Sequence, residues 1–255
     1  MERSSNHRIW TLNLDEEVRR LLDSESSGHD PSHAFRVRQL GGRIATEIAA
    51  DTDVVEAAAL LHDVGHAAGR ADHAQRGAAL ATEVLSRSGF PANKIAAVTA
   101  CIEHHHWQPG RAGDPLRPTL EYQAFADADR LDALGAIGIA RAFAFGGAHH
   151  RPIWHPERDA ATSGPYGVSS IHHFYDKLLR LPGDMYTEIG RELADRRVAV
   201  MEEFLRTFYA EWEVRDADAI AFTSPSLDSF PQGTVEIGDG GRHVAPAVPQ
   251  PNPID

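Results

Sequence analysis

Residues 52–65 read TDVVEAAALLHDVG, an apolar segment that ends in two polar side chains, His62 and Asp63. The Thr-Asp start is typical of a helix N-terminus, and Gly65 is typical of a helix end. The apolar positions recur at helical spacing, at Val55, Ala58 and Leu61. A helix of this composition is expected to be buried. The sequence therefore places a histidine and a carboxylate, both able to bind a metal ion, in the last turn of a core helix.

Helical spacing extends outward from this segment, from about residue 31 to about residue 213. No sustained alternation of period two argues for a sheet, so the expected fold class is all-α. Asp30 and Pro31 predict the start of a helix that carries His33 on its apolar stripe of Val37, Leu40, Ile44 and Ile48. Further helices are expected at about 73–88, 92–105, 119–136, 171–181 and 185–213.

Two segments interrupt this helical pattern. Residues 143–170 are rich in Gly, Pro and His and predict a long irregular excursion between helices. Residues 223–255 are rich in proline and predict a disordered tail. We therefore expect a single helical domain over residues 1–222, with a core at about 29–141 and C-terminal helices at about 171–213.

Composition limits the classes of function. The chain has 255 residues, of which 42% are hydrophobic and 24% charged, as in ordinary globular proteins. Its formal net charge of -12 argues against binding polymeric nucleic acid. Cys101 is the only cysteine, so no intrachain disulfide can form. The N-terminus lacks a signal sequence, and no apolar run is long enough to span a membrane, so we expect a cytoplasmic protein.

The polar residues on successive predicted helices carry a resemblance. In order they are His33 within SHAFRV, His62-Asp63 within LLHDVG, and Asp129 within ADADRLDALG. This order resembles the HD-domain superfamily of metal-dependent phosphohydrolases. The flanks of Asp129, and residues 173–187, resemble a subgroup of small bacterial HD hydrolases similar to nucleoside-triphosphate pyrophosphohydrolases. The resemblance covers roughly residues 29–213.

The resemblance implies a metal site formed by His33, His62, Asp63 and Asp129, with Asp127 as a competing choice for the last ligand. Two imidazoles and two carboxylates suit one divalent transition metal, such as Mn, Fe, Co, Ni or Zn, and Mg is also possible. The implied reaction is hydrolysis of a phosphoester or phosphoanhydride of a small molecule, most simply a nucleotide. A homodimer is compatible with this expectation.

Other polar residues are candidates for catalysis or substrate binding. His66 lies three residues after Asp63, where some members of the superfamily carry a catalytic glutamate, so His66 and Asp63 are the candidate catalytic groups. His105 shares a helix face with apolar residues and is expected to face the pocket. Guanidinium and ammonium groups suit phosphate, which makes basic residues candidates for its binding: Arg36, Arg130, Arg141, Arg151 and Lys177.

Two alternatives remain open from the sequence. HD-domain oxygenases bind two irons through two further histidines, and His73 with His104 or His105 could supply them here. A non-catalytic ligand-binding protein, with a structural metal or none, is the second alternative. A non-catalytic role gives no chemical reason for two carboxylates to accompany two imidazoles.

Overall fold

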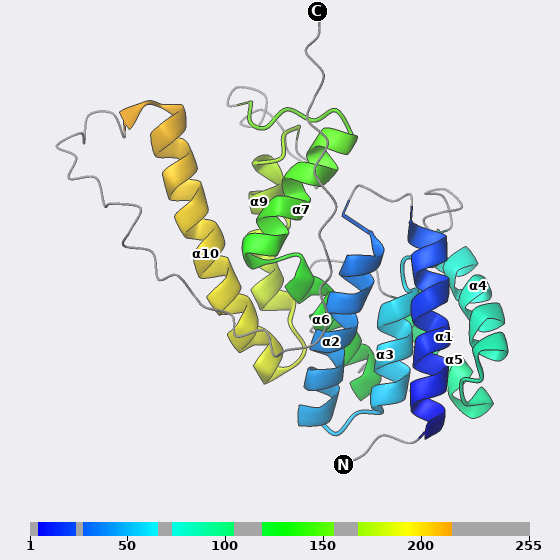
Figure 1. The fold of residues 1–255 in the computed structure, drawn as a ribbon. Coiled ribbons are helices and arrows are strands. Elements are labelled where there is room, and N and C mark those ends of the chain that lie inside the picture. Colours follow the sequence, from blue (N-terminus) through cyan, green and yellow to red (C-terminus); the bar gives the residue numbers. More distant parts are fainter. Residues whose placement is uncertain (1–4, 24–27, 66–72, 105–118, 156–167, 216–255) are drawn as a thin grey trace, which may run out of the picture. The chain divides into compact units, whose positions relative to one another are not determined.

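The computed structural model describes residues 5–23, 28–65, 73–104, 119–155 and 168–215. Within these ranges all regular secondary structure is helical, which confirms the all-α fold class. The elements in chain order are α1 (Ser5–Leu22), α2 (Pro31–Glu47), α3 (Thr52–Leu61), α4 (His73–Ser88), η2 (Ala92–Lys94), α5 (Ile95–Glu103), α6 (Leu120–Asp132), α7 (Gly135–Ala148), α9 (His172–Asp176), η4 (Leu178–Asp184) and α10 (Glu188–Trp212) (Figure 1).

Three helices, α2, α3 and α6, pack against one another and form the centre of the fold. Helix α2 approaches α3 closely at Gly41, where a Cβ atom would lie only 2.9 Å from Cγ1 of Val55. Fully buried side chains fill the space around these helices, including Ile44, Leu61 and Phe125. Each such side chain contributes about 1.5–3 kcal/mol through its removal from water. This packing brings α2, α3 and α6 together at the residues predicted to bind metal.

The starts of the central helices agree with the sequence pattern. Asp30 caps α2, and its side chain accepts a hydrogen bond from the backbone N–H of His33 at 2.9 Å. Pro31 occupies the first turn, as predicted. Helix α3 ends at Leu61, and His62 is its C-cap residue. The His62-Asp63 pair therefore follows the last turn of α3 directly instead of lying in it, because the helix ends before the predicted end at Gly65.

Helix α1 was not predicted. Its buried residues recur every four positions, at Trp10, Leu14, Val18 and Leu22, and all of them are at most 2% exposed. This stripe packs α1 against α3 and α4. The signal was present in the sequence, but the stripe is narrow, and the positions between its members are polar except for Leu12 and Leu21.

The predicted irregular excursion at 143–170 is wrong for its first part, because α7 continues to Ala148. Gly146 and Gly147 suggested a helix break, but Gly146 is needed for packing. A Cβ atom on Gly146 would lie 2.0 Å from Oγ of Ser170. The following segment returns to this point, since the backbone N–H of Ser170 donates to the carbonyl of Pro152 at 3.0 Å.

The helix expected at 171–181 is divided between the short helix α9 and the 3-10 helix η4. Pro182 lies inside η4 and has no N–H to continue an α-helical ladder. Helix α10 begins at Glu188, close to the predicted start.

The chain divides into two compact units, Met1–Tyr209 and Ala210–Asp255. The predicted disordered tail at 223–255 lies outside the described residues. No single helix in the described part is long and apolar enough to cross a membrane. Helices α6 and α7 would reach that length and composition only as a pair bent by 71°.

Candidate metal centre and active site

Four side chains predicted as metal ligands lie close together. His33 is in the first turns of α2, His62 and Asp63 follow α3, and Asp129 is in the last turn of α6. The first three are 1–3% exposed, and Asp129 has a side chain that is 27% exposed. The cluster is therefore buried on most sides and open to a ligand mainly beside Asp129.

The nitrogen and oxygen atoms of this cluster point at one another. Nε2 of His33 lies 3.2 Å from Nε2 of His62, 3.5 Å from Oδ2 of Asp63 and 3.4 Å from Oδ1 of Asp129. Nε2 of His62 lies 3.2 Å from Oδ2 of Asp63 and 3.7 Å from Oδ1 of Asp129. Each of the four residues thus directs one potential ligand atom toward a common point.

The outer ring nitrogens of the two histidines are already engaged. Nδ1 of His62 lies 2.9 Å from the carbonyl oxygen of Ala59, and a carbonyl can only accept a hydrogen bond. Nδ1 of His33 lies 2.7 Å from Oδ2 of Asp132. These contacts favour a proton on both Nδ1 atoms, so both Nε2 atoms present lone pairs. Two lone pairs 3.2 Å apart repel unless a cation or a proton lies between them.

The observed separations are close to those around a bound divalent ion. With metal–ligand bonds of about 2.0–2.1 Å, neighbouring ligand atoms lie about 2.8–3.0 Å apart at octahedral angles and about 3.3–3.4 Å apart at tetrahedral angles. His33, His62 and Asp129 form one set of potential ligands within 4.8 Å of one another, and His29, His33 and Asp63 form another. The donor set and its geometry could therefore hold a divalent metal.

The protonation of the cluster reflects its mixed charges. Burial lowers the pKa of His62, but the negative charges of Asp63 and Asp129 outweigh burial and raise it to about 9. Burial raises the pKa of Asp63, but His62 and His29 outweigh it and hold that pKa well below its ordinary value. The pKa of Asp129 is likewise lowered, because His33 and His62 outweigh its burial. Both carboxylates are therefore ionised, and in the metal-free protein a proton on His62 occupies the place of a cation.

Asp132 supports the cluster without entering it. Besides contacting His33, its carboxylate accepts hydrogen bonds from Nε of Arg36 at 2.7 Å and from Nη1 of Arg141 at 3.0 Å. Burial raises the pKa of Asp132, but His33 and Arg36 outweigh burial and lower it to about 2. A carboxylate held in this way fixes the tautomer and the ring orientation of His33. Asp132 was not among the residues predicted for the site.

His29 is a second residue that the sequence analysis missed. Its Nδ1 lies 2.8 Å from Oδ2 of Asp63, the same oxygen that His62 contacts, so His29 helps to orient that carboxylate. His29 precedes the N-cap of α2 and belongs to no periodic pattern, so only the folded arrangement reveals its position.

The two aspartates that competed as the last ligand have different surroundings. Asp127 is fully buried and accepts hydrogen bonds from the backbone N–H of Tyr186 and of Thr187, both at 2.8 Å, and from the Thr187 hydroxyl at 2.7 Å. It therefore anchors the segment before α10 to α6. Asp129 instead lies beside the two histidines.

The basic residues proposed for phosphate binding are placed as follows. Arg36 and Arg141 bind Asp132, as described above. Arg130 is 5% exposed, donates from Nη1 to the carbonyl of Asp184 at 2.8 Å, and lies 4.8 Å above the ring of Tyr186. Burial lowers the pKa of Lys177, whereas the negative charge of Asp129 raises it, which puts the Lys177 ammonium in the field of the cluster.

For three histidines that were predicted as candidates, the structure describes either no part of the residue or no side chain. They are His66, His73 and His105. His104 is exposed at the end of α5, where its Nδ1 lies 2.9 Å from the carbonyl of Ala100. His104 is therefore not one of the described histidines that gather at the cluster.

Comparison with known proteins agrees with this geometry. The sequence model of the HD domain family matches residues 32–134, and this range includes all four predicted metal ligands. The YpgQ protein of Bacillus subtilis (strain 168) is 37% identical over 191 residues, which are 74% of this chain and 87% of YpgQ.

Solved structures show the same fold. A Lactobacillus plantarum protein is 31% identical, with a TM-score of 0.66 over 84% of this chain and 100% of that one. An HD-superfamily hydrolase from Bacillus thuringiensis is 30% identical, with a TM-score of 0.63 over 82% of this chain and 99% of that one. Bacillus subtilis YpgQ in complex with ADP is 32% identical, with a TM-score of 0.61 over 77% of this chain and 97% of that one. The chain therefore belongs to the HD-domain phosphohydrolase superfamily.

Proposed function

We propose that this protein is a divalent-metal-dependent phosphohydrolase that cleaves a phosphoester or phosphoanhydride bond of a nucleotide. The observation that carries the proposal is the convergence of the two Nε2 atoms of His33 and His62 with the carboxylates of Asp63 and Asp129. The outer contacts of the two histidines favour lone pairs on both Nε2 atoms, and a divalent cation would accept these lone pairs. When bound, such an ion lowers the pKa of water and neutralises charge on phosphate.

The chain's own groups contribute orientation and charge. Asp132 holds the ring of His33, and His29 holds the carboxylate of Asp63, so neither ligand must reorganise on binding. Two ionised carboxylates balance the charge of a divalent ion. The ammonium of Lys177 then adds a positive charge beside Asp129, which favours an anionic substrate.

A nucleotide is the proposed substrate because the related protein YpgQ has been solved in complex with ADP. His66 and His105 remain candidates for proton transfer and for substrate contact. The described residues supply the ligand set and the positive charge near it, which together suit the phosphate end of a nucleotide rather than its base.

The test is a screen of the purified protein for release of phosphate or pyrophosphate from nucleoside mono-, di- and triphosphates. Added Mn, Co, Ni, Zn, Fe or Mg should stimulate release, and a chelator should abolish it. The variant Asp129→Asn serves as the inactive comparison. Lys94→Gln serves as a surface control, because Lys94 binds Asp51 and Asp53, which are not residues of the metal cluster. Metal-independent release, or none from any nucleotide, would reject the proposal.

A further inference from the structure

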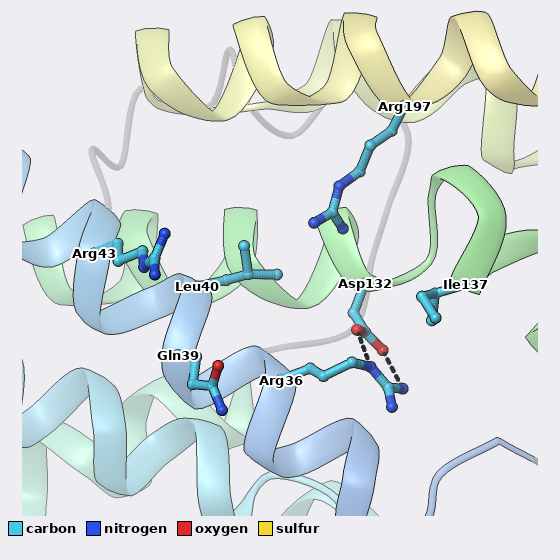
Figure 2. A pocket seen from close by; sticks show the side chains of 7 residues that line it. All are labelled: Arg36, Gln39, Leu40, Arg43, Asp132, Ile137 and Arg197. Atoms are coloured by element: carbon cyan, nitrogen blue, oxygen red, sulfur yellow. Dashed lines mark hydrogen bonds and ion pairs between the residues drawn. The ribbon is translucent and has the colours of Figure 1, made fainter. Parts of the chain in front are cut away.

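A cavity of about 260 Å³ lies next to the metal cluster but does not include its ligands. Its walls come from α2, α6, α7 and α10, as Figure 2 shows. The lining residues are Arg36, Gln39, Leu40, Arg43, Asp132, Ile137 and Arg197. His33 directs its Nε2 atom toward the metal cluster and its Nδ1 atom toward Asp132. Asp132 therefore lies between this cavity and the cluster.

The lining is strongly cationic. The lining has three arginines, Arg36, Arg43 and Arg197, but one carboxylate, Asp132, which already accepts hydrogen bonds from His33, Arg36 and Arg141. The whole chain has a formal net charge of -12, so such an excess of positive charge is unusual for its surface. Like charges gathered in one cavity repel one another, and a bound anion lowers that repulsion.

The arginines have donors to offer. Arg43 is exposed and makes no hydrogen bond or ion pair with another residue that the structure describes. Arg197 extends from α10 toward the cavity and uses only Nη1, which donates to the carbonyl of Leu131 (Figure 2). Arg36 uses Nε and Nη2 on Asp132, which leaves Nη1 (Figure 2). Burial lowers the pKa of Arg197, the negative charge of Asp132 raises it, and the positive charge of Arg36 lowers it. Asp132 is therefore the carboxylate that acts on both of these guanidinium groups.

We propose that this cavity is a second anion site, which binds a phosphate-type polyanion through Arg36, Arg43 and Arg197. Guanidinium groups suit phosphate because their parallel N–H donors match pairs of phosphate oxygens. Pockets that enclose a whole small molecule usually measure about 300–1,000 Å³, so this one fits a phosphate chain better than a complete nucleotide. The occupant is free pyrophosphate or the phosphate end of a nucleotide. Either one competes with Asp132 for Arg36.

The test is calorimetric titration of pyrophosphate into the full-length protein in the presence of a chelator, which removes metal-mediated binding. We expect saturable binding that Arg43→Gln weakens about tenfold, which corresponds to about 1.4 kcal/mol for one lost charged contact. Arg43→Lys, which keeps the charge, should retain most of the affinity. Arg43 has no described contact to lose, so both variants are expected to fold.

Two controls separate this site from other sources of binding. Arg196→Gln removes the neighbouring exposed arginine on α10, which pairs with Glu192 at 3.8 Å, and should leave affinity unchanged. Lys177→Gln removes the ammonium of the proposed substrate site and so reports any pyrophosphate that binds there instead of in the cavity. Absent binding, equal weakening by Arg196→Gln, or weakening by Lys177→Gln but not by Arg43→Gln would overturn the proposal.

The source of the anion follows from two further ligands. Titration with ADP should show binding that Arg43→Gln also weakens if the nucleotide's phosphates can occupy the cavity. ADP that does not bind, while pyrophosphate does, assigns the site to the free anion. Adenosine should not bind in either case, and adenosine binding that Arg43→Gln leaves intact would contradict a site built for phosphate.

Discussion

Nδ1 of His33 and Oδ2 of Asp132 are 2.7 Å apart across the interface between α2 and α6. The contact commits His33 to present Nε2 to the metal cluster, so the ligand and its support come from two helices that pack directly. The same carboxylate binds Arg36 and Arg141. Asp132 thus connects the metal cluster to the cationic cavity.

Substitution of this support should weaken metal binding. Asp132→Asn keeps the size of the side chain but removes its charge, and contacts of this kind change metal affinity about 10–100-fold. We expect a loss in that range in a competition titration against a chromophoric chelator. A wild-type affinity in Asp132→Asn would show that His33 needs no partner on Nδ1.

Asp127 and Asp129 should separate folding from function. Asp127→Asn loses charged acceptor contacts to Tyr186 and Thr187, and we expect it to lower the free energy of unfolding by about 1–3 kcal/mol. Metal affinity per folded molecule should change little. Asp129→Asn should do the reverse, because it removes the negative charge of a predicted metal ligand.

Urea unfolding and metal titration of both variants provide the comparison. An Asp127→Asn variant that folds stably but binds no metal would transfer the ligand role from Asp129 to Asp127.

Lys177 should act on substrate and not on metal. Lys177→Gln removes the positive charge beside Asp129, so we expect KM for a nucleotide to rise about tenfold, with smaller effects on metal content. The control Lys94→Gln changes a lysine that pairs with Asp51 and Asp53, and its kinetics should match the wild type. Equal kinetics of both variants would remove Lys177 from the substrate site.

Metal binding should depend on pH through His62. Its pKa is raised from 6.5 to about 9 in the metal-free protein, so a divalent ion must displace a proton at neutral pH. Apparent affinity should therefore rise about tenfold per pH unit, for one displaced proton, and level off near pH 9. Chelator competition at several pH values measures this slope.

The stability of the metal-free fold should depend on pH in the opposite direction from metal affinity. A raised pKa means that protonated His62 stabilises the metal-free fold below pH 6.5, and that this contribution is lost as the pH rises through about 9. An affinity independent of pH would show that His62 is neutral before metal binds.

The sequence predicted the all-α class and two of the three segments that carry the candidate ligands because their signals are local. The Asp30-Pro31 start fixed the position of His33 on α2, and the apolar segment before Gly65 fixed that of His62. The choice between Asp127 and Asp129 was not local. Two residues apart on a helix face nearly opposite sides, and both sides of α6 are buried, so burial patterns cannot distinguish them.

The parts that the sequence did not reveal depend on contacts distant in the chain. His29 is separated from Asp63 by 34 residues, and its role exists only when α2 packs on α3. Gly146 suggested a break in α7, but it is required because Ser170 packs closely against it. This contact has no signature in the sequence. Arg43 and Arg197 form one cavity only when α2 and α10 face each other, which no spacing predicts.

The most direct test of the proposed function is to measure bound metal and nucleotide hydrolysis on the same preparations of wild-type protein and Asp129→Asn. We expect about one divalent ion per wild-type chain, with metal-dependent release of phosphate or pyrophosphate. Both should be lost together in the variant, while its helical content stays unchanged. A variant that keeps its metal and its activity, or a wild type that holds two irons and releases nothing, would contradict the proposed metal centre and its reaction.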